Sequence, residues 1–379
     1  MNKIKTINVF TIGDSSLLNT WSNIPYFLTT TLERQGYIIN RINIESNHII
    51  QKFWDKIILR VLAKLFRNNI YWYDRTFLCY VETFIKIWRA NKKYRDNDIN
   101  LFITYSFYNP FSKKPNVLFS DWDYETMIKD KRQRDPYFFE KWSIMRQRKV
   151  IKKADLIISL FPNAAEEMKL RYNKSNIICL DKNVVNVFFD KEIDEKNIIE
   201  KKQNSYKLLF IGTLKYLESA KLLIKVYKDL KNFYPLLELV IIGIEEKQLP
   251  KLPGGVVCYG YLNKGNSRDN EIYYKELISA KLFINPTPVW AGYSSTIEAM
   301  FFYTPVIVSP YTDFVKEFGR RIDFGMYCED FNISSLKHCI KQVLDKDNYE
   351  QMCVNARNRV KDYTWDSYVK KLMIKIQNI

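Results

Sequence analysis

The stretch 281–309, KLFINPTPVWAGYSSTIEAMFFYTPVIVS, decides the fold. Its apolar run 282–284 stops at an Asn-Pro pair, as a short buried strand does, and 305–308 begins another such run. Between the two runs lies a segment of helical composition that contains Glu298. Ser294 and Ser295, which lie four and three positions ahead of that glutamate, form a capping signal together with Thr296. The stretch therefore predicts a strand, a loop, a helix and a second strand.

The start of this helix is a candidate anion site. Helix N-termini present free N–H groups and the positive end of the helix dipole, which together favour phosphate. The same hydroxyl groups are equally consistent with a purely structural cap, so the stretch by itself leaves both readings open.

The composition limits the possible classes of protein. With 379 residues the chain is long enough for two domains. Hydrophobic residues make up 47% of the chain and aromatic residues 15%, and this composition excludes a disordered chain. No apolar run is long enough to predict a transmembrane helix, and the N-terminal residues suggest a first strand instead of a signal peptide. The formal net charge of +17 indicates a polyanionic partner, which could be nucleic acid, an anionic membrane or a phosphorylated substrate.

The six cysteines are scattered and the two histidines lie far apart. No Cys-x-x-Cys pair occurs, so we predict no metal site and expect reduced thiols, as is usual in a cytoplasmic protein.

Strands and helices alternate along both halves of the chain, which predicts two parallel-sheet α/β domains. The charged, polar segment 191–205 reads as the linker between them. The expected strands are 5–12, 37–44, 99–105, 116–120, 154–160 and 177–180 in the first half, and 207–211, 237–242, 256–259, 282–284 and 305–308 in the second.

Polar turns follow two expected strands of the first half. Ligands of open α/β sheets bind at the carboxyl ends of the strands, so these turns are candidate acceptor contacts. Asp14 and Asp121 are candidate general bases there. The alternative for the second turn is an aspartate that caps the next helix. The other acceptor-side candidates are Gly13, Ser15 and Trp122.

The segment 49–95 combines basic and aromatic residues at helical spacing. One face carries a cation every four residues, and most apolar side chains fall on the other side. Such a helix can lie on an anionic membrane, or it can pack on the sheet with solvated lysines. The candidate membrane contacts are Lys52, Lys56, Arg60 and Lys64.

The region 183–368 resembles the GT-B glycosyltransferases, especially glycosyltransferase family 4. The resemblance rests on several short motifs in a characteristic order: LFIG at 209–212, Gly260-Tyr261, the block at 283–309 with Glu298, Asn355-Ala-Arg357 and Tyr363-Thr-Trp365. It implies two Rossmann-like domains facing each other across a cleft. We accordingly expect an acceptor-binding domain at 1–190, a nucleotide-sugar domain at 191–365 and a final helix at 366–379 that crosses back to the first domain.

The resemblance also implies a donor site. The nucleobase would lie near Tyr261, the ribose would bind Glu298, and the diphosphate would meet the hydroxyl residues at the helix start. Lys215 is a candidate for stabilising the leaving phosphate. The expected donor contacts are Gly212, Thr213, Lys221, Tyr261, Gly292, Tyr293, Ser294, Ser295, Thr296 and Glu298.

Three positions depart from the family pattern. Trp290 stands where family members place the first of two glutamates, and Thr213 and Glu218 stand where an Arg and a Lys usually hold the diphosphate. Lys215 and Lys221 are nearby cations that could replace them.

We therefore expect a retaining, metal-independent transferase without a cofactor other than its nucleotide-sugar co-substrate. The expected acceptor is a glycan or a lipid-linked glycan in bacterial surface polysaccharide or glycolipid assembly. The expected place is the cytoplasm, peripheral on the inner face of the membrane, with no nucleic-acid partner. The alternatives are an inactive GT-B scaffold, a charge-driven nucleic-acid-binding protein and, less consistent with the residues, an epimerase of the same fold.

Overall fold

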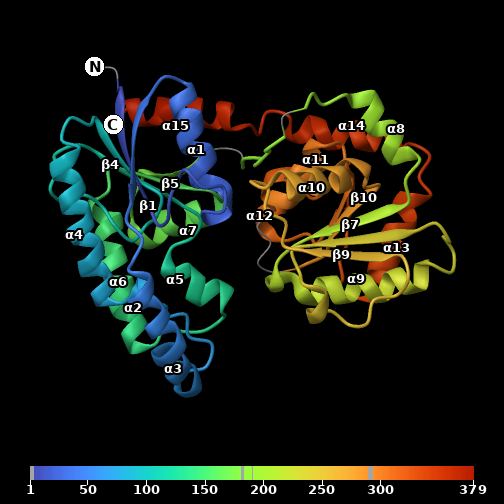
Figure 1. Cartoon of the computed structure of the whole chain (residues 1–379), viewed down its shortest axis with the longest axis horizontal. Coiled ribbons are helices and arrows are strands. Elements are labelled where there is room, and N and C mark those ends of the chain that lie inside the picture. The colour runs from blue at the N-terminus through green and yellow to red at the C-terminus, as the bar shows by residue number, and fades with distance from the viewer. Residues whose placement is uncertain (1–3, 181–182, 190, 289–292) are drawn as a thin grey trace. The chain divides into compact units, whose positions relative to one another are not determined.

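The computed structural model describes residues 4–180, 183–189, 191–288 and 293–379. The chain forms two compact units, each with its own sheet (Figure 1). Unit 1 comprises Met1–Asn183 and Trp365–Ile379, and unit 2 comprises Val184–Thr364. The sequence interpretation had put the first boundary at 190/191. The observed boundary lies earlier because Val184 and Val185 are buried, and the N–H of Val185 donates to the carbonyl of Tyr363 in unit 2 (2.8 Å).

Unit 1 contains a six-stranded parallel sheet with the order β2-β1-β3-β4-β5-β6. Its inner strands are short and almost fully buried, as expected for a parallel sheet covered on both faces. All six strands expected in the first half are present. Their bounds are β1 (Thr6–Thr11), β2 (Ile38–Asn43), β3 (Ile99–Phe102), β4 (Asn116–Ser120), β5 (Leu156–Ser159) and β6 (Ile177–Cys179).

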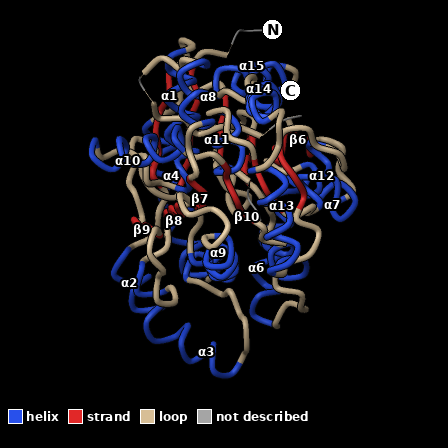
Figure 2. The backbone as a smooth tube through the Cα atoms, turned by 90° about the vertical axis from the view of Figure 1, so that its right-hand side faces the viewer, coloured by secondary structure: helices blue, strands red, loops and turns tan. Residues whose placement is uncertain are grey.

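Helices, drawn blue in Figure 2, cover the strands of each unit. The first α-helix begins at Ile24, because Ser22 and Asn23 have positive φ (56° and 70°) and Pro25 suits the first helical turn. The helices of unit 1 are α1 (Ile24–Arg34), α2 (His48–Phe53), α3 (Leu59–Leu65), α4 (Phe77–Lys93), α5 (Tyr124–Thr126), α6 (Phe138–Lys153), α7 (Pro162–Tyr172) and α15 (Trp365–Gln377).

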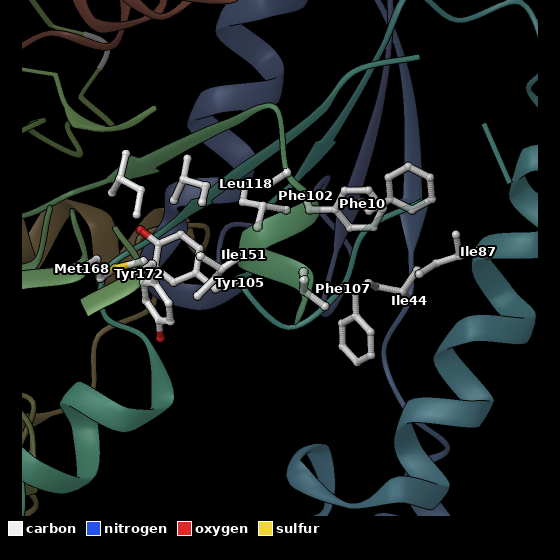
Figure 3. Close-up of a cluster of buried hydrophobic side chains, with 14 of the residues drawn as sticks. Phe10, Ile44, Ile87, Phe102, Tyr105, Phe107, Leu118, Ile151, Met168 and Tyr172 are labelled. Atoms are coloured by element: carbon white, nitrogen blue, oxygen red, sulfur yellow. The ribbon is translucent and has the colours of Figure 1, made fainter. Parts of the chain in front are cut away.

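The core of unit 1 fills the space between the sheet and its helices (Figure 3). The rings of Phe10 on β1 and Phe102 on β3 stack with centroids 4.2 Å apart. The hydroxyl of Tyr105 donates to the carbonyls of Ser120 and Ile158, both at 2.8 Å, which ties β4 to β5 just where both strands end. This core therefore fixes the carboxyl edge of the sheet, where the candidate acceptor contacts lie.

Unit 2 contains a second six-stranded parallel sheet, with the order β12-β11-β10-β7-β8-β9. The order reverses at the pair β7 and β10, so this sheet is also doubly wound, as the alternating pattern predicted. The strands are β7 (Lys207–Ile211), β8 (Glu238–Ile242), β9 (Val256–Gly260), β10 (Leu282–Asn285), β11 (Val306–Val308) and β12 (Gly325–Tyr327).

The helices of unit 2 include two that the sequence interpretation missed. The segment 191–205, which was predicted to be a linker, contains helix α8 (Glu195–Gln203), and the prediction of a linker was therefore wrong. Helix α12 (Thr312–Phe318) and the edge strand β12 were not predicted, because both are short. The other helices are α9 (Leu217–Leu230), α10 (Ser267–Ser279), α11 (Ser294–Phe301), α13 (Ile333–Leu344) and α14 (Tyr349–Val360).

Helix α8 is anchored by a fully buried lysine. The Nζ of Lys202 donates to the carbonyls of Leu277 and Ala280, both at 3.0 Å, and to the hydroxyl of Thr304 at 2.8 Å. Burial lowers the pKa of Lys202 to about 7. A segment of linker-like composition is thus part of the unit 2 core.

We predict that Lys202 makes the stability of the protein rise with pH. Because the pKa of the folded state lies below that of the unfolded lysine, the unfolded chain binds more protons between about pH 7 and pH 10, and stability increases across that window. Lys202→Met removes this pH dependence and leaves three buried acceptors without their donor, which costs about 1–3 kcal/mol. Urea unfolding of both proteins at pH 7 and pH 10 measures the difference.

The matched control is Lys201→Met, on the exposed side of the same helix, which should leave stability and its pH dependence almost unchanged. A difference between wild type and Lys202→Met that stays constant from pH 7 to pH 10 would contradict the prediction.

Candidate functional site

Three neighbouring strands of unit 2 end in glycine at the carboxyl edge of the sheet. The N–H of Gly212 donates to the carbonyl of Ile242 (3.0 Å), and the N–H of Gly243 donates to the carbonyl of Gly260 (2.6 Å). Gly243 has a φ of +96°, and a Cβ at this position would lie 2.5 Å from the carbonyl oxygen of Gly212. The backbones of Gly212 and Gly243 therefore pack directly against each other, while the side chains of Tyr216 and Glu245 lie against Gly212 and Gly260.

The start of α11 lies beside this glycine edge. Ser294 is exposed, Ser295 is half-buried and Thr296 is buried. The hydroxyl of Ser295 donates to the carbonyl of Ile211, the last residue of β7, at 3.5 Å. The structure thus brings together the predicted diphosphate contacts on α11 and the turn of Gly212 and Thr213.

The capping signal was misread. Helix α11 begins at Ser294 with Tyr293 at the N-cap, and no side-chain hydrogen bond caps it. The three hydroxyl residues lie inside the first turn instead of ahead of it. With Tyr293 at the N-cap, a capping box would need a glutamate at position 296, whereas the glutamate is at position 298. The side chain of the N-cap residue Tyr293 therefore does not occupy the first-turn N–H groups, which is consistent with the anion-site hypothesis.

Glu298 is buried in a cage of hydrogen-bond donors. Its carboxylate oxygens accept from the Nζ of Lys264 at 2.6 and 2.7 Å. The hydroxyl of Tyr273 donates to Oε2 at 2.9 Å, and that of Tyr274 donates to Oε1 at 3.0 Å. Burial, followed by the charge of Glu298, raises the pKa of Tyr273 well above its usual value, which keeps this hydroxyl protonated. A ribose hydroxyl can reach Glu298 only by displacing one of these three donors.

Lys264 is a functional candidate that sequence reasoning missed. It follows Gly260-Tyr261 by only a few residues, and that position in the loop was the single available signal. Its Nζ also donates to the carbonyl of Asn186 (3.2 Å) and lies 4.3 Å from the ring centre of Tyr273. The lysine therefore joins the loop after β9 to α10, to α11 and to the segment that opens unit 2.

The remaining predicted donor contacts are dispersed along the same edge. Tyr261, Thr213 and Lys215 are exposed, whereas Tyr293 is buried with its ring edge-on to Phe314 (5.5 Å). Lys221 pairs with Glu218 on the surface of α9 (2.8 Å), so a role for Lys221 at the diphosphate requires breaking this pair. Gly292, and the unusual Trp290, lie outside the described residues.

In the first acceptor-side turn of unit 1, hydrogen bonds make the carboxylate of Asp14 a weak general base. The N–H and the hydroxyl of Ser16 donate to its carboxylate at 2.8 and 2.7 Å, and these bonds lower the pKa of Asp14. The N–H of Gly13 donates to the side-chain oxygen of Asn43 (3.1 Å). Ser15 is buried in the same turn. A carboxylate with a lowered pKa binds a proton weakly at neutral pH.

The second turn places Asp121 at the end of β4. Its Oδ1 accepts from the N–H of Trp122 (2.8 Å), and the Trp122 ring stacks on Phe161 with centroids 4.7 Å apart. The helix-capping alternative applies to Asp123 instead, which accepts from the N–H of Thr126 (3.0 Å) and pairs with Arg171 (2.9 Å). Asp121 is half-buried and does not cap α5.

Two properties of the described residues concern metals and membranes. Across the described ranges, no group of three or more His, Cys, Asp and Glu side chains could hold a metal ion. In the same ranges no helix has the length and apolar character to span a bilayer. The predicted membrane contacts Lys52, Lys56, Arg60 and Lys64 all lie exposed on one helical segment of unit 1.

Residues 191–360 match the family model described as "Glycosyl transferases group 1". This part, which is less than half of the chain, is similar to a group 1 glycosyl transferase domain. The match runs from the segment before α8 to the end of α14 and so includes the glycine edge, the start of α11, Glu298 and Lys264.

A curated relative extends the likeness. The uncharacterized glycosyltransferase MJ1069 of Methanocaldococcus jannaschii is 26% identical over 254 residues, which cover 62% of this chain and 60% of the relative. The alignment therefore spans about three fifths of that relative's length.

Solved structures match the chain over nearly its whole length. Sucrose-phosphate synthase from Thermosynechococcus elongatus has a TM-score of 0.71 at 14% identity, covering 99% of this chain and 98% of that one. Anabaena Alr3699/HepE, solved with UDP and glucose, has a TM-score of 0.63 at 10% identity and covers 99% and 100%. WaaG, a glycosyltransferase involved in lipopolysaccharide biosynthesis, has a TM-score of 0.61 at 12% identity, and the match covers 97% of this chain and 98% of WaaG. These likenesses show the fold, and the predicted GT-B class is confirmed.

We predict that the Lys264–Glu298 pair is a strong internal support of unit 2. Lys264→Met leaves a buried carboxylate without its cation and should cost about 3–5 kcal/mol in the free energy of unfolding. Adding Glu298→Gln to this variant should recover most of the loss, because the unpaired charge is gone. Urea unfolding of the two single variants and the double variant measures the coupling.

The matched control is a lysine–glutamate pair on the surface of the same unit, between Lys221 and Glu218. Lys221→Met should cost no more than about 0.5 kcal/mol. Equal losses in Lys264→Met and Lys221→Met would refute the account of the buried pair.

Proposed function

We propose that the protein is a glycosyltransferase that moves a sugar from a nucleotide-sugar donor to a hydroxyl group of a glycan or lipid-linked acceptor. One observation carries the proposal: in the part that matches the group 1 model, the turn of Gly212 after β7 lies next to the start of α11, where the hydroxyl of Ser295 contacts the end of β7. Backbone N–H groups at such a place favour the diphosphate of a nucleotide sugar. The likeness to Anabaena HepE, solved with UDP and glucose, supports the same reading.

The proposed donor lies along the carboxyl edge of unit 2. Its diphosphate meets Ser294, Ser295 and Thr213, and its nucleobase lies against the exposed ring of Tyr261. The ribose approaches Glu298 and takes the place of one of the three donors that now surround the carboxylate. Donor binding is thereby coupled to a rearrangement of the Lys264 cage.

The chemistry that we propose is the stabilisation of a leaving nucleoside diphosphate. Positive charge and fixed N–H groups at the leaving phosphate lower the barrier without a metal ion, and Lys215, exposed in the turn after β7, can contribute a cation. The lowered pKa of Asp14 makes this carboxylate a weak base, which leaves Asp121 as the better protein base. We favour a retaining reaction in which the leaving phosphate itself accepts the acceptor proton.

The proposed acceptor belongs to bacterial surface polysaccharide or glycolipid assembly, with the enzyme acting in the cytoplasm at the inner face of the membrane. The likeness to WaaG, which is involved in lipopolysaccharide biosynthesis, supports this choice.

A charge test on α11 separates donor binding from stability. Ser294→Asp places a carboxylate in the first turn of α11, where the helix dipole favours it, so the fold should stay as stable or gain a few tenths of a kcal/mol. The same carboxylate repels a diphosphate. In a thermal-shift screen with UDP, GDP, ADP, CMP and dTDP, one of these nucleotides should raise the Tm of the wild type. The same nucleotide should not raise the Tm of Ser294→Asp.

The matched control is Ser334→Asp, exposed in the first turn of α13 in the same unit, which should keep the full nucleotide shift. An unchanged shift in Ser294→Asp would remove the diphosphate from α11. No shift with any nucleotide in folded wild type would favour the inactive-scaffold alternative.

A further inference from the structure

The helical segment His48–Phe53, Trp54–Ile58 and Leu59–Leu65 of unit 1 has no buried residue. Two rows of side chains run along it, each with a spacing of four. The cationic row is Lys52, Lys56, Arg60 and Lys64. The apolar row lies one residue further on at each step and is also exposed: Ile49 (79%), Phe53 (57%), Ile57 (49%), Val61 (52%) and Leu65 (70%). The alternative in which the apolar face packs on the sheet is therefore wrong for this row.

A π-helical turn at Trp54–Ile58 keeps each of the two rows on one side of the helical segment. In an α-helix, side chains four residues apart drift by about 40° at each step, because 3.6 residues complete a turn. A π turn contains more residues per turn and rotates the chain back in the opposite sense. The wider turn in the middle of the segment thus offsets part of the drift and holds both rows on the solvent side.

The apolar row continues onto α6. Phe66, directly after α3, packs its ring against Phe138 and Phe139, with centroids 6.1 and 5.1 Å away. From there three exposed side chains follow along α6: Phe138 (62%), Trp142 (58%) and Met145 (51%). We call the eight residues Ile49, Phe53, Ile57, Val61, Leu65, Phe138, Trp142 and Met145 the apolar surface of unit 1. So much exposed apolar area along adjoining elements is typical of an interaction site.

The charge of the protein is concentrated in the unit that carries this surface. Unit 1 contains 34 lysines and arginines against 19 aspartates and glutamates, a formal charge of +15, whereas unit 2 contains 25 against 23 and has +2. Within 48–67 there are five lysines and arginines and a single acidic residue, Asp55. The partner of the surface must therefore accept apolar side chains and carry negative charge.

We propose that the apolar surface of unit 1 docks on an anionic lipid bilayer. The apolar row enters the interface between head groups and acyl chains, and the parallel row of Lys52, Lys56, Arg60 and Lys64 contacts lipid phosphates. Duplex nucleic acid offers phosphates but no apolar phase for Phe53, Ile57 or Trp142. The proposal deepens the proposed function by naming the surface on which a lipid-linked acceptor would be met, but it depends on unit 1 alone. A failure of donor binding in unit 2 would leave it standing.

The test is co-sedimentation of the full chain with vesicles of phosphatidylcholine, alone or mixed with phosphatidylglycerol. Wild type should bind the mixed vesicles at least tenfold more tightly than the neutral ones. Phe53→Ser with Ile57→Ser should weaken binding at least tenfold. Lys52→Ala, Lys56→Ala, Arg60→Ala and Lys64→Ala together should abolish the preference for phosphatidylglycerol.

Matched controls change exposed residues outside the surface. Leu170→Ser removes an exposed leucine of α7 in unit 1, and alanine at Lys225, Lys228, Lys247 and Lys346 removes four exposed cations of unit 2. Both controls should bind mixed vesicles as wild type does. The thermal unfolding midpoint and the circular dichroism spectrum of each variant, compared with wild type, report that the chain is folded.

Three outcomes would overturn the proposal. The first is that wild type binds neither vesicle. The second is that Phe53→Ser with Ile57→Ser binds mixed vesicles as tightly as wild type, which would reduce the contact to adsorption by charge. The third is that the protein forms a dimer in solution that this double variant dissociates, since a second copy would then cover the apolar row.

Discussion

The buried ion pair of Lys264 and Glu298 is the interaction on which the arrangement of the candidate donor site depends. It joins the loop after β9 to α11, and Tyr273 and Tyr274 bring α10 into the same cluster. The opening segment of unit 2 is attached as well, because the N–H of Phe188 donates to the hydroxyl of Tyr274 (2.7 Å). An ion pair of this kind tolerates no loss of one partner, since a single buried charge is far less stable than the pair.

The same helix carries both the ion pair and the proposed phosphate contacts. Glu298 lies one turn after Ser294, so the cage that holds the carboxylate also fixes the direction in which the start of α11 points. At the other end, the contact between Ser295 and the carbonyl of Ile211 sets the distance from α11 to β7. The close backbone approach of Gly243 to Gly212 completes the arrangement by joining the ends of β7 and β8. Structural support and the proposed binding of the donor thus use one set of elements.

The sequence predicted the sheets well and the polar interior poorly, for physical reasons. Buried parallel strands are short apolar runs, and such runs are visible without any tertiary information, as at 207–211 and 282–284. Helix α8 was not visible, because a lysine-rich segment resembles a linker unless Lys202 is known to find three acceptors in the core. The partner of Glu298 was not visible either, because nothing local relates it to a lysine 34 residues earlier. The outward orientation of Phe53 and Val61 also depends on what covers the helix, and periodicity alone does not determine this.

The two units divide the properties of the chain. Unit 2 is nearly neutral and contains the residues that match the group 1 model, whereas unit 1 is strongly basic and carries the apolar surface. This division is what a transferase needs if one part binds a water-soluble donor and the other meets an acceptor at a membrane. Net charge alone is consistent with nucleic acid, an anionic membrane or a phosphorylated substrate. Because the positive charge is concentrated in unit 1, which also carries the apolar surface, we favour lipid.

Amide hydrogen exchange with and without the stabilising nucleoside diphosphate tests the central claim most directly, because it locates the ligand on the chain. Bound nucleotide should slow exchange at 212–218, at 260–266 and in the first turn of α11, and should leave the carboxyl edge of the unit 1 sheet unchanged. Slowed exchange confined to unit 1, or none in these three segments while the nucleotide is bound, would contradict the placement of the donor at the glycine edge of unit 2.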